Sequence, residues 1–163
     1  MKYGIFTKPI HVEKIVNYLN QYTKLYYIIS TDKRELYDCY NYDIGISYAF
    51  GSLIDINKTP TKIWFNYHTA PLPEYKGGDV YARAIKDKIT HWAVILHRMT
   101  MELDDGEVIK RIDFPLRTIP TSTNEIGSIA HYYLFQLFKA TIESLGEPIV
   151  FGTCNSLEEK IEG

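Results

Sequence analysis

Short apolar runs alternate with segments of helical spacing along the first half of the chain. Buried strands are predicted at residues 2–6, 25–29, 43–47 and 62–67. Within residues 11–22, apolar side chains recur every three or four positions, which predicts a helix, and a short helical stretch is expected at about 33–40. Strands that alternate with helices favour a parallel sheet with right-handed crossovers.

The second half of the chain adds a longer strand pair and a long helix. We expect a helix at 79–88, a strand at 92–100 and, after a turn at 104–106, an antiparallel return strand at 108–114. The sequence Ser122-x-x-Glu125 is typical of a capping box and predicts a helix that ends at Gly146. The pattern therefore predicts one α/β domain over residues 1–163. Its sheet is mostly parallel and twisted, with helices on both faces and an antiparallel hairpin near the C-terminal half.

Composition narrows the class of protein without pointing to a ligand. The chain has 163 residues, 45% of them hydrophobic and 23% charged, which is typical of a single globular domain. A net charge of −2 does not indicate a nucleic-acid partner, and no apolar run approaches the roughly 20 residues that span a bilayer. Cys39 and Cys154 have no metal-type spacing, and the N-terminus does not resemble a signal peptide. We expect a reduced, cytoplasmic protein that binds no metal, and we expect a homodimer through the 92–100 strand and its hairpin partner.

The most informative chemistry lies where the 62–67 strand ends. Asn66 and His68 are two residues apart, so on an extended chain their side chains point to the same side. In parallel sheets, ligands bind outside the carboxyl ends of strands, and that is where this pair falls. An amide donor, an imidazole and a carboxylate from another loop would suit acyl transfer without a covalent intermediate. Taken alone, His68 is equally compatible with a structural role, and the Asp104-Asp105-Gly106 turn with ordinary turn chemistry.

Three other features carry weaker signals. Gly77-Gly78 lacks the spacing of a phosphate-binding loop and better fits a loop that lets backbone approach a ligand. His97 lies inside the 92–100 strand, where a structural or supporting role is expected. The five histidines form no metal-binding pattern.

Three linked motifs resemble the folate-dependent formyltransferase family. Its hallmark Asn-x-His-x-x-x-x-Pro-x-(Tyr/Trp)-x-Gly corresponds here to residues 66–77, and its Asp-x-Gly after a long strand corresponds to 104–106. A Tyr/Ser-x-x-Gly-x-(Leu/Ile) element precedes both at residues 48–54. The resemblance spans roughly residues 43–115 and implies a Rossmann-like formyltransferase fold. Residues 70–73, Ala-Pro-Leu-Pro, depart from the usual family sequence toward variants seen in sugar N-formyltransferases.

This resemblance implies that 10-formyltetrahydrofolate donates a formyl group to a small-molecule amine, with a nucleotide-linked amino sugar as the candidate acceptor. By the same resemblance, Asn66 and His68 would stabilise the oxyanion, and Asp104 would pair with His68 and help to remove the proton from the amine. The implied folate-binding residues are Phe50, Gly51, Ser52, Leu53, Ile54, Leu72, Pro73 and Leu103. Two alternatives stay open at this point: a folate-binding or regulatory module without transfer, and a hydrolase that releases formate from 10-formyltetrahydrofolate.

Overall fold

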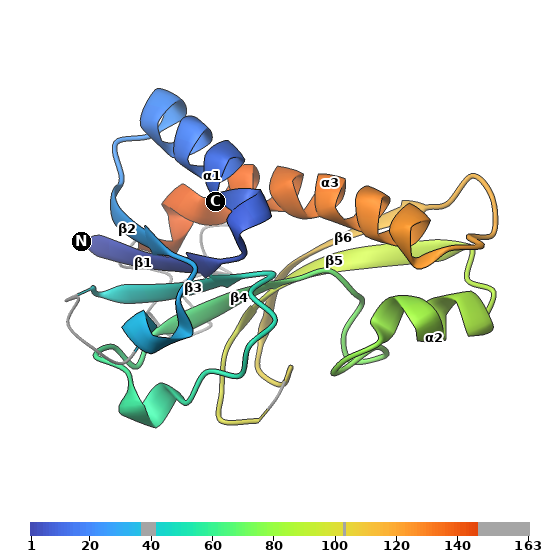
Figure 1. Cartoon of the computed structure of the whole chain (residues 1–163), viewed down its shortest axis with the longest axis horizontal. Coiled ribbons are helices and arrows are strands. Elements are labelled where there is room, and N and C mark those ends of the chain that lie inside the picture. The colour runs from blue at the N-terminus through green and yellow to red at the C-terminus, as the bar shows by residue number, and fades with distance from the viewer. Residues whose placement is uncertain (37–41, 103, 147–163) are drawn as a thin grey trace, which may run out of the picture.

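The protein folds around a single six-stranded sheet in the strand order β2-β1-β3-β4-β5-β6 (Figure 1). The structure is a computed structural model of the chain, and it describes residues 1–36, 42–102 and 104–146. The strands are β1 (Lys2–Thr7), β2 (Tyr26–Ser30), β3 (Ile44–Tyr48), β4 (Trp64–His68), β5 (His91–Arg98) and β6 (Val108–Pro115). The helices are α1 (Pro9–Tyr22), α2 (Val80–Lys86) and α3 (Thr123–Thr141), and the 3-10 turns are η1 (Lys33–Leu36), η2 (Ile56–Lys58) and η3 (Ile142–Gly146).

The pairing of the strands confirms a mostly parallel first half followed by an antiparallel hairpin. β1 pairs in parallel with β2 and with β3, and β3 pairs in parallel with β4. β5 then runs antiparallel to both β4 and β6. Because β5 uses both of its edges within the sheet, the outer edge of the sheet on this side is β6. Any dimer that extends the sheet on this side would therefore use β6.

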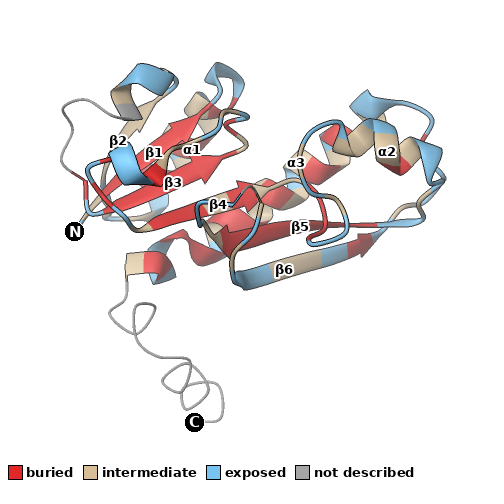
Figure 2. Ribbon diagram, turned by 90° about the horizontal axis from the view of Figure 1, so that it is seen from below, coloured by how far each residue is buried: buried red, intermediate tan, exposed pale blue. Residues whose placement is uncertain are grey.

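The two faces of the sheet are covered differently. One face packs against α1 and α3 through a large apolar cluster that includes Ile15, Leu134 and Phe138. On the other face, a smaller cluster comprises Phe6, Tyr42, Phe50, Ile56 and Trp64. Among the described residues, this second cluster takes side chains from strands, loops and η2 but from no α-helix. Of the predicted helices on both faces, α1 and α3 lie on the first face, and the 3-10 turn η2 contributes to the second. Figure 2 shows the buried central strands and the more exposed β6.

The ends of the helices follow local sequence signals. The Ser122 hydroxyl accepts a hydrogen bond from the Glu125 backbone N–H, and the Glu125 carboxylate accepts one from the Thr121 N–H. The Ser122 bond satisfies an N–H that a helix start leaves free, as the capping box predicts, whereas the Glu125 carboxylate bonds to the N–H one residue before the N-cap. The α-helix ends at Thr141, and η3 continues to Gly146. Of the stretch predicted to be helical at 33–40, the described part forms the 3-10 turn η1, and residues 37–40 lie outside the described residues.

The four parallel strands bring their carboxyl ends to one edge of the sheet. β1, β3 and β4 end there at Thr7, Tyr48 and His68, and the Thr7 hydroxyl donates to the Tyr48 carbonyl at 2.7 Å. None of the helices in the described ranges has the length and apolar character needed to cross a membrane.

Candidate active site

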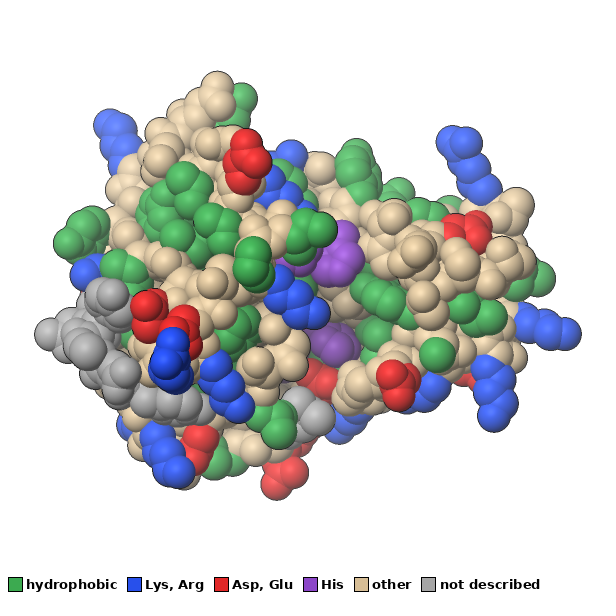
Figure 3. All heavy atoms as spheres, in the orientation of Figure 1, with side chains coloured by type: hydrophobic (Ala, Val, Ile, Leu, Met, Phe, Trp, Pro, Cys, Tyr) green, Lys and Arg blue, Asp and Glu red, His purple; other side chains and the backbone are tan. Residues whose placement is uncertain are grey.

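A cavity of about 1250 Å³ opens at the carboxyl ends of β3 and β4. Its lining includes residues from the N-terminal ends of α1, α2 and α3, from β3, β4 and β5, and from the loops after β3, before α2 and after β5. In Figure 3, histidine side chains lie in a hollow near the centre of the molecule, with lysine or arginine atoms beside them. The cavity extends around the edge of the sheet, so groups from both faces reach it.

Asn66 lines this cavity and contacts a residue of the neighbouring strand. In the register of β4 and β5, Asn66 is directly opposite His97, and the Asn66 Nδ2 atom is 3.1 Å from His97 Nε2. The other ring nitrogen, His97 Nδ1, lies 3.0 Å from the Arg98 carbonyl oxygen, which can only accept a hydrogen bond. His97 Nδ1 therefore carries the proton, Nε2 accepts, and the Asn66 amide donates.

His97 is suited to this role because it is buried and uncharged. Only 1% of its surface is exposed, and burial lowers its pKa below the ordinary value. A neutral His97 uses one N–H of the Asn66 amide and leaves the second N–H for a ligand. The supporting role expected for His97 thus has a definite contact, which the strand register creates.

His68 and Asp104 come together although 36 residues separate them in the sequence, because the loop after β5 folds back over β4. The His68 Nδ1 atom is 3.7 Å from Asp104 Oδ1, and the two side chains are only 15% and 7% exposed. The second Asp104 oxygen accepts a hydrogen bond of 2.7 Å from the Gly77 N–H. Asp104 adopts a left-handed backbone conformation, with φ of 50°. His68 Nε2 lies 3.3 Å from the Tyr75 carbonyl oxygen.

The three predicted catalytic side chains therefore border one cavity. The group comprises an oriented amide donor, an imidazole beside a carboxylate, and open volume in front of them. Hydrogen-bond donors preorganised around a reacting carbonyl stabilise the oxyanion that forms when a nucleophile attacks it. With an imidazole and a carboxylate 3.7 Å apart, a proton can pass between them or through a bridging water.

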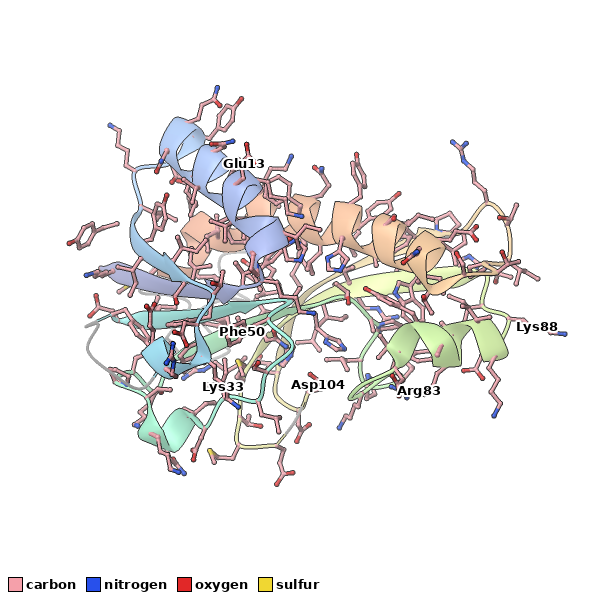
Figure 4. All side chains as sticks on the ribbon, in the orientation of Figure 1. Glu13, Lys33, Phe50, Arg83, Lys88 and Asp104 are labelled. Carbon is pink, nitrogen blue, oxygen red and sulfur yellow. The ribbon has the colours of Figure 1, made fainter. Side chains whose placement is uncertain are left out.

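Most of the predicted folate-binding residues border the same cavity. The segment Phe50–Ile54 lines it, with Gly51 at a φ of +75° that favours glycine. Figure 4 labels Phe50 on the loop after β3 and Asp104 on the loop after β5. Residue Leu103 lies outside the described residues.

Leu72 and Pro73 are placed differently from this segment. They are joined by a cis peptide bond, Leu72 is buried, and neither is among the residues that line the cavity. The Leu72 carbonyl accepts a hydrogen bond of 3.2 Å from Arg111 of β6. Both residues belong to the loop that follows His68.

Sequence reasoning missed a second group of polar side chains in the cavity. Lys8, His11 and Lys14 come from the start of α1, and His131 comes from α3. The three-residue spacing of His11 and Lys14 on a predicted helix was the available signal, because it places both on one helical face. No local pattern could bring His131 to them. In the described residues, no group of three or more side chains is arranged to hold a metal ion.

Comparison with known proteins gives a consistent picture, although no family model matches the chain. The chain is 33% identical over 90 residues to phosphoribosylglycinamide formyltransferase from Dictyostelium discoideum, which covers 53% of this chain and 42% of that protein. It is 24% identical to methionyl-tRNA formyltransferase from Halalkalibacterium halodurans, over 78% of this chain and 40% of that protein.

Solved structures show the same arrangement of strands and helices. An N-formyltransferase from Helicobacter canadensis, in complex with folinic acid and dTDP-3-aminofucose, superimposes with a TM-score of 0.68. Its sequence identity is 20%, over 87% of this chain and 62% of that chain. Phosphoribosylglycinamide formyltransferase from Campylobacter jejuni gives a TM-score of 0.67 at 15% identity, over 90% of this chain and 98% of that chain. This chain has the formyltransferase fold.

The formyltransferase fold found here spans about two fifths of the length of the curated relatives it matches. It nevertheless includes the central sheet and the strand-end cavity described above. The names of the matched proteins share formyl transfer and differ in the acceptor.

Proposed function

We propose that this chain is an N-formyltransferase that uses 10-formyltetrahydrofolate as the formyl donor. The observation that carries the proposal is the placement of Asn66, His68 and Asp104 around one cavity, from three separate positions in the sequence. The sequence likeness to formyltransferases and the folinic acid in the Helicobacter canadensis structure support the same reaction.

The proposed reaction follows from the positions of these groups. The acceptor amine attacks the formyl carbon of 10-formyltetrahydrofolate, and the carbonyl oxygen becomes an oxyanion. The free N–H of Asn66 and a protonated His68 donate hydrogen bonds to it. The attacking nitrogen loses a proton to Asp104, directly or through water. The tetrahedral intermediate then collapses: the bond between the formyl carbon and N10 breaks, and N10 of the folate takes up the proton that Asp104 received.

For the acceptor, we propose the amino group of a nucleotide-linked amino sugar. The Ala-Pro-Leu-Pro sequence at residues 70–73 and the fold shared with a sugar N-formyltransferase support this choice. A cytoplasmic location and a homodimer belong to the same proposal.

The test combines 10-formyltetrahydrofolate with a panel of amino-sugar nucleotides and follows the formylated product by mass spectrometry. Asn66→Ala should lower kcat about 100- to 1000-fold, because one preorganised oxyanion donor is lost. Asn57→Ala, at an exposed position in η2, is the matched control and should keep full activity. Formate release at the same rate with and without an acceptor would favour a hydrolase. Folate binding without any turnover would favour a binding or regulatory module.

A further inference from the structure

The backbone of the loop before α2 contacts both members of the His68–Asp104 pair. The His68 Nε2 atom lies 3.3 Å from the Tyr75 carbonyl oxygen, and the Gly77 N–H donates to Asp104 Oδ2 at 2.7 Å. The Asp104 side chain is only 7% exposed, so water has little access to replace this hydrogen bond. The position of the segment 75–78 therefore affects the geometry of the pair.

Arg83 of α2 contacts the same segment through its side chain. Its Nη2 atom donates to the carbonyl oxygens of Lys76 and Gly78, the second at 3.2 Å. The Arg83 Cζ atom also lies 5.4 Å from the centroid of the Tyr75 ring, within the range of a cation–π contact. Figure 4 labels Arg83 on α2 and Asp104 on the loop after β5. One guanidinium thus contacts three residues of the segment that borders the pair.

The contacts of Arg83 and Asp104 meet in a single peptide group. The carbonyl that accepts from Arg83 and the N–H that donates to Asp104 belong to the same peptide bond, which joins Lys76 and Gly77. Because a peptide group is planar, a fixed carbonyl oxygen restricts the direction of the N–H at the other end. A positive charge beside the oxygen also polarises the group and strengthens the hydrogen bond that its N–H donates. Arg83 can therefore influence Asp104 through this one peptide group.

The helix α2 anchors the segment at a second point. The Tyr75 hydroxyl donates to Asp87, the C-cap residue of α2, and the Tyr75 ring packs 4.7 Å from the Trp92 ring. Arg83 and Asp87 are four residues apart, a spacing that places both on one side of a helix. Gly77 has a φ of +82°, which favours glycine and sets the direction of its N–H. The segment is thus held against one side of α2.

We propose that Arg83 is a positioning residue for formyl transfer and that it orients the Asp104 carboxylate through the peptide group between Lys76 and Gly77. The inference rests on the proposed function, because Asp104 is the group that receives the proton of the amine. With its second oxygen held by the Gly77 N–H, Asp104 keeps the first oxygen 3.7 Å from His68. Loss of the Arg83 guanidinium should therefore slow the reaction step rather than weaken folate binding.

The first test compares kcat in the product assay with the Kd for folinic acid. Arg83→Met should lower kcat about tenfold and leave the Kd within about twofold of the wild type, because a misdirected carboxylate impairs proton transfer and leaves the cavity open. Arg83→Lys should keep most of kcat, since a single nitrogen makes both carbonyl contacts and an ammonium can replace it. Lys86→Met is the matched control, because Lys86 is an exposed cation of the same helix, and it should keep full activity. Equal kcat values for Arg83→Met and Lys86→Met, or a raised Kd with unchanged kcat, overturn the inference.

A double-mutant cycle shows whether Arg83 acts through Asp104. In an Asp104→Asn background, Arg83→Met should change the remaining kcat by less than about twofold, because the carboxylate that it orients is already gone. A merely structural contribution of Arg83 would give the same tenfold loss in both backgrounds. That result would overturn the inference.

Nuclear magnetic resonance of the Gly77 amide separates this inference from the proposed function. The hydrogen bond to Asp104 should shift the Gly77 amide proton downfield. Arg83→Met should move this signal upfield, whereas Lys86→Met should not, and the other amide signals show whether each variant is folded. An active wild type whose Gly77 signal is the same in Arg83→Met overturns the inference and leaves the proposed function standing. An Arg83-dependent Gly77 signal in a protein without formyl transfer would support the contact with Asp104 and count against the proposed reaction.

Discussion

Because His11 and His131 are partly buried and stacked, we predict that the protein loses stability when the pH falls from 7 to 5. Burial and the nearby lysines lower the pKa of each ring from 6.5 to about 4 in the folded state. A depressed folded pKa means that the unfolded chain binds protons first, so stability is full above pH 6.5 and falls as the pH drops toward 4. By proton linkage, each ring lowers the free energy of unfolding by about 2 kcal/mol when the pH falls from 7 to 5. Both rings border an open cavity, and solvent screening reduces this to about 1 kcal/mol each.

Urea denaturation at pH 7 and at pH 5 measures this difference. Between pH 7 and pH 5, the two histidines should lower the free energy of unfolding by about 2 kcal/mol, in addition to any change caused by other titrating groups. In the double variant His11→Gln/His131→Gln, this contribution should be absent. Its free energy of unfolding should therefore fall less between pH 7 and pH 5 than that of the wild type, whatever its stability at pH 7. His91→Gln, at an exposed position at the start of β5, is the matched control and should behave like the wild type. If the double variant and the wild type show the same difference between the two pH values, the reasoning about the buried pair is refuted.

Two further predictions concern the sheet beneath the site. His97→Phe removes the acceptor that orients the Asn66 amide, so it should lower kcat about tenfold and leave the Kd for folinic acid unchanged. His97→Gln should keep most of kcat, because the glutamine amide oxygen can accept the hydrogen bond from Asn66. Equal kcat values for these two variants in the product assay would contradict the positioning role. Gly45→Ala should lower the free energy of unfolding by about 1–3 kcal/mol, because its Cβ would overlap the Trp64 ring. Thermal denaturation checks this, and an unchanged melting temperature would show that Trp64 moves aside without cost.

Local sequence patterns predicted the structural features that depend only on residues close together in the chain. The two-residue spacing of Asn66 and His68 was enough to place both on one side of β4, since side chains alternate along any strand. The Ser122 and Glu125 capping box likewise needed only four residues. The alternation of apolar runs and helical spacing was enough for the parallel first half of the sheet. Local pattern did not reveal that, among the described residues, the second apolar cluster takes its side chains from strands, loops and a 3-10 turn and from no α-helix.

The order of elements therefore followed from the amino-acid sequence by itself, as did the position of Asn66 and His68 on one side of β4. Tertiary structure alone decided which distant groups surround them. Asp104 reaches His68 because a loop folds back, His97 orients Asn66 because of strand register, and Lys14 meets His131 because two helices pack on one face. The physical reason is that the spacing of two residues along one helix or strand determines the directions in which their side chains point. Distances between elements depend on packing of the whole chain, and it is these distances that set the charges and hydrogen bonds of the cavity.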